Sequence, residues 1–141
     1  MADKLIMEVH VISDGKDVSV LKGPAGEVVM IPFGGTVEGE IFNGVVRPGG
    51  TDCQRVNLAG VRHMSARYML EGTDYTGEKC HIFVENNGYF TQMQMPFQTV
   101  PTFMTDSKAL APYLHRNKFR GEGHPTGDGN ICIRLFEVDA E

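Results

Sequence analysis

The residue best placed for acid–base chemistry is Asp52, which lies two positions after the sequence "RPGG". Proline cannot donate to a strand ladder and glycine permits tight turns, so residues 47–50 are expected to form a turn. A carboxyl group at the rim of a sheet is partly removed from water, which raises its pKa toward the range that general acids and bases use. Alternatively, Asp52 caps the turn by accepting a hydrogen bond from a backbone N–H.

A second candidate group lies on two stretches, 61–71 and 78–85, that alternate between apolar and polar residues around the turn-rich segment "GTDYTG". If Glu71 faces Glu78 across this segment, Tyr68 lies opposite His81, and both share one apolar face with Glu85. His81 would then act as a base oriented by Glu85, with Tyr68 stabilising charge. A one-residue slip in register would break this group. A hydrogen bond between Tyr68 and His81 inside a structural core is the simpler alternative.

Four further residues are candidates for ligand contacts: Glu38, Arg67, Phe83 and Asn87. Glu38 belongs to a strand-like stretch, Phe83 shares the alternating face of His81, and Arg67 would bind an anion if it points inward. Asn87 precedes a glycine, so it is equally well explained as a turn residue. We expect no metal and no cofactor, because the five histidines and three cysteines show no ligand spacing. The sequence "GEGHPTGDG" precedes a strand rather than a helix, so we interpret it as a connector or lid.

Composition narrows the class of protein. The 141 residues carry a formal net charge of −5 and contain no basic run, which argues against nucleic acid as a partner. No apolar stretch reaches the roughly 18 residues of a membrane helix, and the first residues do not resemble a signal peptide. Three widely spaced cysteines are typical of reduced thiols. We therefore expect a cytoplasmic protein with no membrane partner.

The elements that must position these residues are mostly short strands separated by turns about every ten residues. This pattern predicts an all-β fold, a single closed antiparallel β-barrel spanning residues 1–141 as one domain. The run 36–46 is interpreted as one strand kinked at Gly39 and Gly44. A final strand is expected over 130–138. One short helical turn is expected in the C-terminal third, within 107–114, after a Ser107 cap and shortened by Pro112.

Three stretches carry a resemblance to a known family: "IPFGGTVEGEIFNGVVRPGGTDCQ", "RYMLEGTDYTGEKCHIFVENNG" and "QTVPTFMTDSKALAPYLHRNKFRGEG". Together they resemble the domain-of-unknown-function 3237 family over about residues 5–138. The resemblance implies a small closed antiparallel barrel without an assigned activity. The sequence departs from the family pattern in two places. Cys53 stands where tryptophan is common, and residues 113–115 read Tyr-Leu-His instead of Trp-Leu-Asn, and both changes would reshape a pocket.

Three hypotheses for function follow. The barrel binds a small, partly apolar organic molecule in its lumen or mouth. Alternatively, it is a cofactor-free acid–base enzyme of isomerase, cyclase or dehydratase type that uses Asp52 with Tyr68, His81 and Glu85. Thirdly, it is a packed barrel whose role is structural or oligomeric, since barrels of about eight strands can be filled by side chains. A homodimer is expected from the family type and the apolar strand faces.

Overall fold

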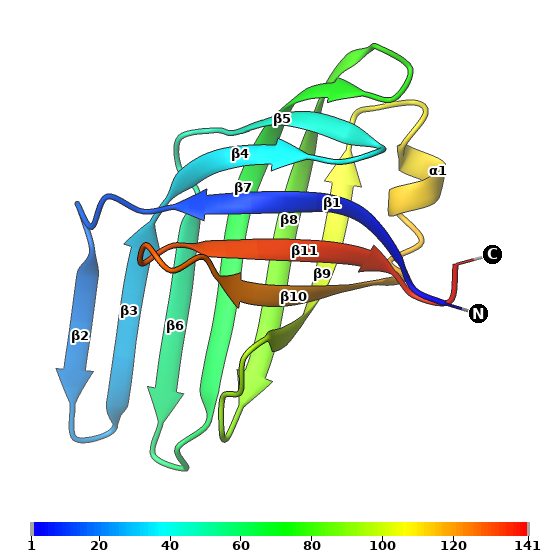
Figure 1. Cartoon of the computed structure of the whole chain (residues 1–141). Helices are drawn as coiled ribbons and strands as arrows, with labels where there is room; N and C mark the ends of the chain where they lie inside the picture. Colours follow the sequence, from blue (N-terminus) through cyan, green and yellow to red (C-terminus); the bar gives the residue numbers. More distant parts are fainter. Residues whose placement is uncertain (1, 141) are drawn as a thin grey trace.

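The computed structural model describes residues 2–140, and over that range the chain forms eleven strands and one short helix (Figure 1). The elements are β1 (Lys4–Ile12), β2 (Ser19–Gly23), β3 (Gly26–Pro32), β4 (Gly34–Glu38), β5 (Phe42–Val46), β6 (Thr51–Asn57), β7 (Arg62–Asp74), β8 (Lys79–Phe90), β9 (Phe97–Thr105), α1 (Ala111–Leu114), β10 (Phe119–Pro125) and β11 (Ile131–Glu137).

Strand β7 closes the sheet because its two edges have different partners. One edge pairs with β8 along nearly its whole length, from Arg62 opposite Phe90 to Thr73 opposite Lys79. The other edge is divided: residues 62–67 pair with β6, and residues 70–74 pair with β5. From β5 the sheet continues through β4, β1, β11, β10 and β9 back to β8. These eight strands form a closed antiparallel barrel, which confirms the predicted fold class.

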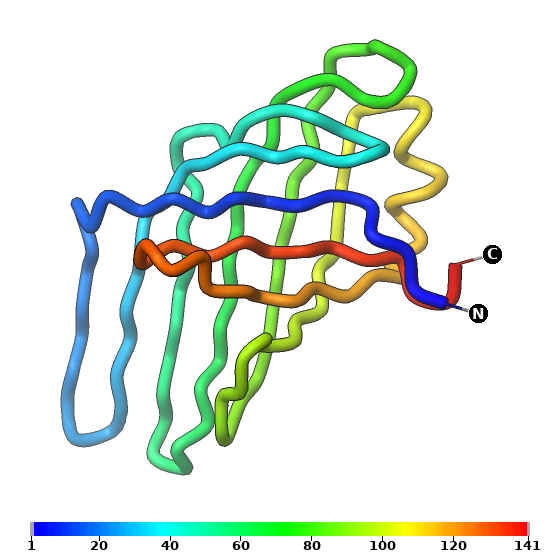
Figure 2. The backbone as a smooth tube through the Cα atoms, viewed as in Figure 1, coloured from blue at the N-terminus to red at the C-terminus, as the bar shows by residue number. Residues whose placement is uncertain are grey.

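Strands β6, β3 and β2 lie outside the closed barrel. They extend the sheet sideways from the first half of β7, at the left of Figure 1, and the same extension is visible in the trace of Figure 2. Strand β2 forms its free edge and is exposed along its whole length. The extension matters for the site because β6 carries Asp52 beside the barrel strand β7.

The barrel interior is apolar, and one of its ends is covered by α1. Alternate residues of each barrel strand point inward, as a two-residue repeat requires. Leu110 and Leu114, from α1 and the residue before it, are fully buried in the same core. The helix is the short turn that the sequence predicted. With four residues it is far too short to cross a bilayer, and residues 2–140 contain no helix long and apolar enough to do so.

A buried carboxylate ties the loop before α1 to the end of β7. Asp74 Oδ2 accepts a hydrogen bond from the Ser107 hydroxyl at 2.6 Å, and Oδ1 accepts one from the Thr76 hydroxyl at 2.6 Å. These bonds lower the pKa of Asp74 to about 2, so its carboxylate remains charged. Ser107 Oγ also accepts the Leu110 N–H at 3.1 Å, as expected for a serine that starts a helical turn.

The structure corrects the interpretation of residues 36–46. They form two strands, β4 and β5, joined by a turn, instead of one kinked strand. The Asn43 side chain closes this turn by bonding the backbone N–H and carbonyl of Gly39. Gly44 is needed for close approach: a Cβ there would lie 2.2 Å from the Glu71 carbonyl oxygen on β7.

Two further strands were missed in the second half of the chain. Residues 97–105 form β9 despite Pro101, which lies opposite Asn86 of β8. The stretch interpreted as a connector or lid contributes Gly121 to Pro125 to β10, which pairs with β9 and β11. Glycine and proline disfavour strands in isolation, but here the neighbouring strands determine the conformation.

We predict that Gly44→Ala destabilises the protein by about 1–3 kcal/mol, because the added methyl group meets backbone atoms that have no room to move. Urea unfolding followed by circular dichroism measures the change. Gly34→Ala is the matched control in the neighbouring strand, since a Cβ there has no atom within 4 Å. Equal effects for the two variants would contradict the proposed close approach.

Candidate functional site

A small cavity lies inside the barrel at the end opposite α1. It is bordered by the last part of β1 and the first residues of β9 and β11, the ends of these strands that point away from α1 in Figure 1. Its volume is about 50 Å³, enough for the end of a small molecule but below the roughly 300 Å³ of a drug-sized site. The lining residues are Val11, Phe33, Asp52, Met64, Ala66, Tyr68, Asn86, Phe97, Thr99, Ile131 and Ile133.

Three residues that line this cavity each carry a buried polar atom without a protein partner. These atoms are the Tyr68 hydroxyl, Asn86 Oδ1 and the Thr99 hydroxyl, and within residues 2–140 they are the buried side-chain oxygens and nitrogens left without a hydrogen bond. An unpaired buried polar group costs about 1–3 kcal/mol, so proteins rarely tolerate several together. Their shared position marks the cavity as a place where polar groups can receive a ligand.

The sheet register explains why these groups face one another. Asp52 on β6 and Asn86 on β8 both lie directly opposite Ala66, which is on the strand between them. Side chains in such a row point to the same side of the sheet, and here that side is the lumen. Ala66 contributes only a methyl group, so space remains between the carboxyl group and the amide. Tyr68, two residues further along β7, points to the same side.

Glycines on β10, the strand that pairs with β9, provide the rest of the space. A Cβ at Gly121 would lie 2.4 Å from the Thr99 hydroxyl oxygen and 3.7 Å from Asn86 Oδ1. A Cβ at Gly123 would lie 2.0 Å from the ring of Phe97. These two glycines allow the Thr99 hydroxyl and the Phe97 ring to occupy the interior, so the sequence "GEG" shapes the cavity.

Asp52 is a partly buried carboxyl group held by a short polar chain. Arg62 donates to Gln54 Oε1 at 2.9 Å, and Gln54 Nε2 donates to Asp52 Oδ2 at 2.8 Å. Burial raises the pKa of Asp52 above 3.8, although the Gln54 hydrogen bond and the positive charge of Arg62 partly offset this increase. One carboxylate oxygen is therefore oriented, and the pKa is shifted in the direction that favours a role as general acid or base.

Tyr68 has the opposite chemical character, that of a permanent hydrogen-bond donor. Its side chain is buried, and its ring packs edge-on against Phe33 with the ring centres 5.2 Å apart. Burial raises the pKa of Tyr68 well above that of free tyrosine, so the hydroxyl keeps its proton at neutral pH. A protonated phenol facing the cavity can donate to a carbonyl or an oxyanion of a bound molecule.

The remaining candidate residues from the sequence lie on the outer face of the barrel. His81 Nδ1 is 3.2 Å from Asp106 Oδ2, and Arg67 Nε is 3.2 Å from Glu85 Oε2. Glu38 Oε1 is 3.0 Å from His10 Nε2. Outer positions are also occupied by Phe83 opposite Met69 and Asn87 opposite Ser65. Of the eight candidate residues, the structure places only Asp52 and Tyr68 together at the cavity.

The strand register is the reason that the hairpin group separates. Glu71 lies opposite His81 instead of Glu78, and Tyr68 lies opposite Val84. This shift of three residues is odd in number, so it exchanges the inner and outer faces of β8 relative to β7. The expectation that Tyr68, His81 and Glu85 share one face was therefore wrong.

Asn86 and Thr99 were missed as cavity residues, although the sequence contains a signal for both. The inward positions of β8 repeat every two residues, as Cys80, Ile82 and Val84, and the same repeat leads to Asn86. The sequence "NNG" suggested a turn, which ended the expected strand too early. In the same way, Thr99 lies between the inward residues Phe97 and Pro101 of the unpredicted strand β9.

A larger open groove of about 500 Å³ lies on the sheet extension, between β2, β3 and β6, with His63 and Tyr89 at its border. Their rings stack with centres 4.3 Å apart. None of the buried unpartnered polar atoms among the described residues lies there. The smaller cavity is therefore the stronger candidate site.

The sequence model of one protein family, "Protein of unknown function (DUF3237)", matches residues 4–95. The chain belongs to this family. A UPF0311 protein of Clostridium acetobutylicum is 35% identical over 120 residues, which cover 71% of this chain and 73% of that protein. The match confirms the resemblance that the glycine-rich sequence motifs indicated. It assigns no activity, because the DUF3237 family is itself described as one of unknown function.

Solved structures share this DUF3237 fold. A protein of unknown function from Clostridium acetobutylicum has a TM-score of 0.80 at 26% identity, covering 99% of this chain and 100% of its own. A β-barrel-like protein from Acinetobacter baumannii has a TM-score of 0.71 at 21% identity, covering 96% and 94%. A structure described as an enzyme from Penicillium herquei has a TM-score of 0.69 at 16% identity, covering 98% and 94%. The last two likenesses show the fold alone.

We predict that Asp52→Asn raises the melting temperature at neutral pH. The pKa of Asp52 is higher in the folded state than the value of 3.8 in the unfolded chain. The protonated carboxyl group therefore favours folding at a pH below 3.8, and this stabilisation is lost as the pH rises through the folded-state pKa. Asparagine removes the cost of the buried charge. Its advantage over aspartate should therefore be present at neutral pH and vanish below 3.8, as measured by calorimetry across pH.

Asp128→Asn is the control of opposite sign. The Thr126 hydroxyl lowers the pKa of Asp128, so its charged form favours folding at neutral pH, and the variant should be less stable there. An Asp52→Asn protein that is less stable than the native protein at neutral pH would contradict the assignment of Asp52 as a carboxylate destabilised by burial.

Proposed function

We propose that this barrel binds a small, partly apolar organic molecule whose polar end enters the cavity at Tyr68, Asn86 and Thr99. The observation that carries the proposal is that three residues with an unpartnered buried polar atom line one cavity together with Asp52. Ligand sites commonly combine an apolar lining with a few such polar groups.

The hydrogen-bonding character of these atoms indicates the ligand class. The Tyr68 and Thr99 hydroxyl groups can donate to a carbonyl oxygen, whereas Asn86 Oδ1 can only accept. A molecule that satisfies all three offers both an acceptor and a donor. Hydroxy-carbonyl compounds with an aromatic or alicyclic body fit this requirement. Because the cavity holds only about 50 Å³, the body of the ligand would lie toward the open end against Phe33 and Phe97.

A purely packed barrel is the main rival to this proposal, and the small cavity is compatible with it. The polar atoms argue against it. A packed core has no need for three polar groups that each cost about 1–3 kcal/mol when unpaired. Apolar residues of similar size would fill the same space without that cost, so retention of the polar groups supports a binding role.

Cofactor-free acid–base catalysis is the second candidate function, favoured by the raised pKa of Asp52 beside the cavity. In this version the Asp52 carboxylate takes a proton from the carbon next to the ligand carbonyl, and the C–H electron pair forms an enolate. Tyr68 and Thr99 hold the developing oxyanion, and return of the proton to another carbon completes an isomerisation. The enzyme from Penicillium herquei supports catalysis as a use of this fold.

We predict that binding is detected when the protein is titrated with a panel of aromatic and alicyclic hydroxy-carbonyl compounds and followed by NMR. Tyr68→Phe should weaken the best binder about 10-fold, because one buried hydrogen bond to the ligand is lost. His81→Gln is the control on the outer face and should bind as the native protein does. Equal affinity in the native and Tyr68→Phe proteins would contradict the proposed site.

The same titration in deuterated water separates the two functions. Catalysis by Asp52 would exchange hydrogen for deuterium next to the carbonyl, and Asp52→Asn would slow that exchange by about 100-fold or more. Binding without exchange in the native protein identifies a binding protein and excludes the proton transfer. Exchange that Asp52→Asn leaves unchanged would exclude Asp52 as the base.

We further propose that the protein forms a homodimer through the outer face of β7, β8 and β9. An apolar row, Met69, Phe83 and Met104, crosses these strands, and Met69 and Met104 are exposed. The next row contains the ion pair of Arg67 and Glu85. A two-fold axis passing between Arg67 and Glu85 would place each charge near the opposite charge of a second copy, which would make the surface complementary to itself.

Size-exclusion chromatography with light scattering measures the mass of the protein in solution and so tests this interface. We predict a mass of twice the 15.5 kDa of one chain, and we predict that Met104→Glu shifts the protein to the single-chain mass. Val20→Glu, on the exposed strand β2, is the control and should leave the dimer intact. A native protein with the mass of one chain, or a Met104→Glu protein that remains dimeric, would refute this interface.

A further inference from the structure

The outer face of the barrel brings together side chains of three metal-binding types. His10 on β1 lies opposite Cys132 on β11, and Cys132 lies opposite His124 on β10. In the adjacent row Glu8 lies opposite Glu38 of β4 on one side and Arg134 on the other. These residues alternate with core positions such as Val9 and Ile133, so they point away from the lumen.

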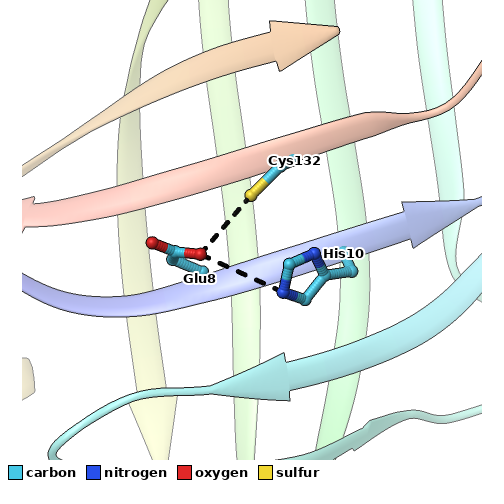
Figure 3. Close-up of side chains that lie close together, drawn as sticks. All are labelled: Glu8, His10 and Cys132. Carbon is cyan, nitrogen blue, oxygen red and sulfur yellow. Dashed lines mark hydrogen bonds and ion pairs between the residues drawn. The ribbon is translucent and has the colours of Figure 1, made fainter. Parts of the chain in front are cut away.

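Glu8, His10 and Cys132 form the centre of this group (Figure 3). Glu8 Oε2 is 3.8 Å from Cys132 Sγ and 4.0 Å from His10 Nε2, and the three donor atoms all lie within 4.8 Å of one another. In a tetrahedral zinc site, bonds of about 2.0–2.3 Å place neighbouring ligand atoms roughly 3.3–3.8 Å apart. The two distances from Glu8 are close to this range, and movement of these partly exposed side chains on binding would bring the three donors to a common ion.

We propose that Glu8, His10 and Cys132 bind a Zn²⁺ ion on the outer face of the barrel. A thiolate, an imidazole and a carboxylate are the donor types that zinc takes, and this mixture excludes Mg²⁺ and Ca²⁺, which prefer oxygen ligands alone. Glu38 is the fourth ligand available within the protein, because its Oε1 already lies 3.0 Å from His10 Nε2.

Surrounding groups orient the proposed ligands. Arg134 Nε lies 3.5 Å from Glu8 Oε1, which leaves Oε2, the other oxygen of this carboxylate, for the ion. His124, next to Cys132 in its row, is already bound to Glu122, with Nε2 2.9 Å from Oε1. A partner such as Arg134, which holds one oxygen of Glu8, fixes the orientation of metal ligands in many sites.

The position of the group suits an ion that arrives from solvent. The three central side chains are partly buried, with 36% of the His10 side chain and 28% of the Glu8 side chain exposed. The carboxylates of Glu8 and Glu38 supply two negative charges, against one positive charge from Arg134. The strand wall separates this group from the cavity, so the metal site is independent of the proposed ligand site.

The spacing of possible ligands along the chain does not reveal this site. Positions 8 and 10 are close in sequence, but Cys132 is more than a hundred residues away. Only the pairing of β1 with β11 brings Cys132 beside His10. The expectation of no metal rested only on the spacing of ligands along the sequence. In this group the register of the sheet, and not the sequence spacing, brings the side chains together.

Titration with Co²⁺ tests the proposal, since tetrahedral Co²⁺ replaces Zn²⁺ and reports thiolate coordination by absorption. The full chain is treated with a chelator, dialysed and titrated. We expect one Co²⁺ per chain, a sulfur-to-cobalt charge-transfer band, and loss of both on addition of one equivalent of Zn²⁺. Absence of the charge-transfer band in the native protein would overturn the proposal.

Variants assign the band to this group. Cys132→Ser should abolish the charge-transfer band, and His10→Gln should weaken Co²⁺ binding by about 100-fold or more. Cys53→Ser, which changes another partly buried free thiol, is the matched control and should retain the band. Asp52→Asn should also retain it, because the cavity is a separate site. Circular dichroism of each metal-free variant verifies the fold, and a band that survives in folded Cys132→Ser would refute the assignment.

Discussion

The structure depends on the backbone hydrogen bonds of a single strand, β7. Each strand edge must find partners for its N–H and carbonyl groups, and β7 finds them with three different strands. The pairing with β8 and β5 closes the barrel, whereas the pairing with β6 carries Asp52 to the rim. The 13 residues of β7 make this division possible, because a strand of average length would serve only one partner on that edge.

The cavity exists because the side chains at a few positions on these strands are small. Ala66 leaves a space between Asp52 and Asn86, while Gly121 and Gly123 admit the Thr99 hydroxyl and the Phe97 ring of the neighbouring strand β9. Elsewhere in residues 2–140, the buried polar side chains Asp74, Ser107 and Glu137 have hydrogen-bond partners, which makes the unpartnered polar atoms at this end exceptional. A barrel of this size can therefore be packed over most of its length and still retain a polar site at its open end.

The two-residue repeat of the strands gives the two faces of the barrel wall different chemistry. Residues facing the lumen form the cavity, whereas the residues between them on β1 and β11 place a carboxylate, an imidazole and a thiol on the outer face. Membership in the DUF3237 family accounts for the barrel but assigns neither site. Both proposed sites are argued from the register, which determines what lies opposite each side chain.

The sequence by itself determined the all-β class and the helical turn after Ser107, because turns, caps and alternation are local signals. It could not determine which face of β8 lies beside Tyr68. A register shift by an odd number of residues across the six-residue loop moves every side chain of β8 to the other face of the sheet, and no local interaction prevents such a shift. Strands β9 and β10 contain proline and glycine, and only neighbouring strands make them regular. Contacts between residues distant in sequence decided the cavity and the outer cluster, so these belong to the tertiary structure.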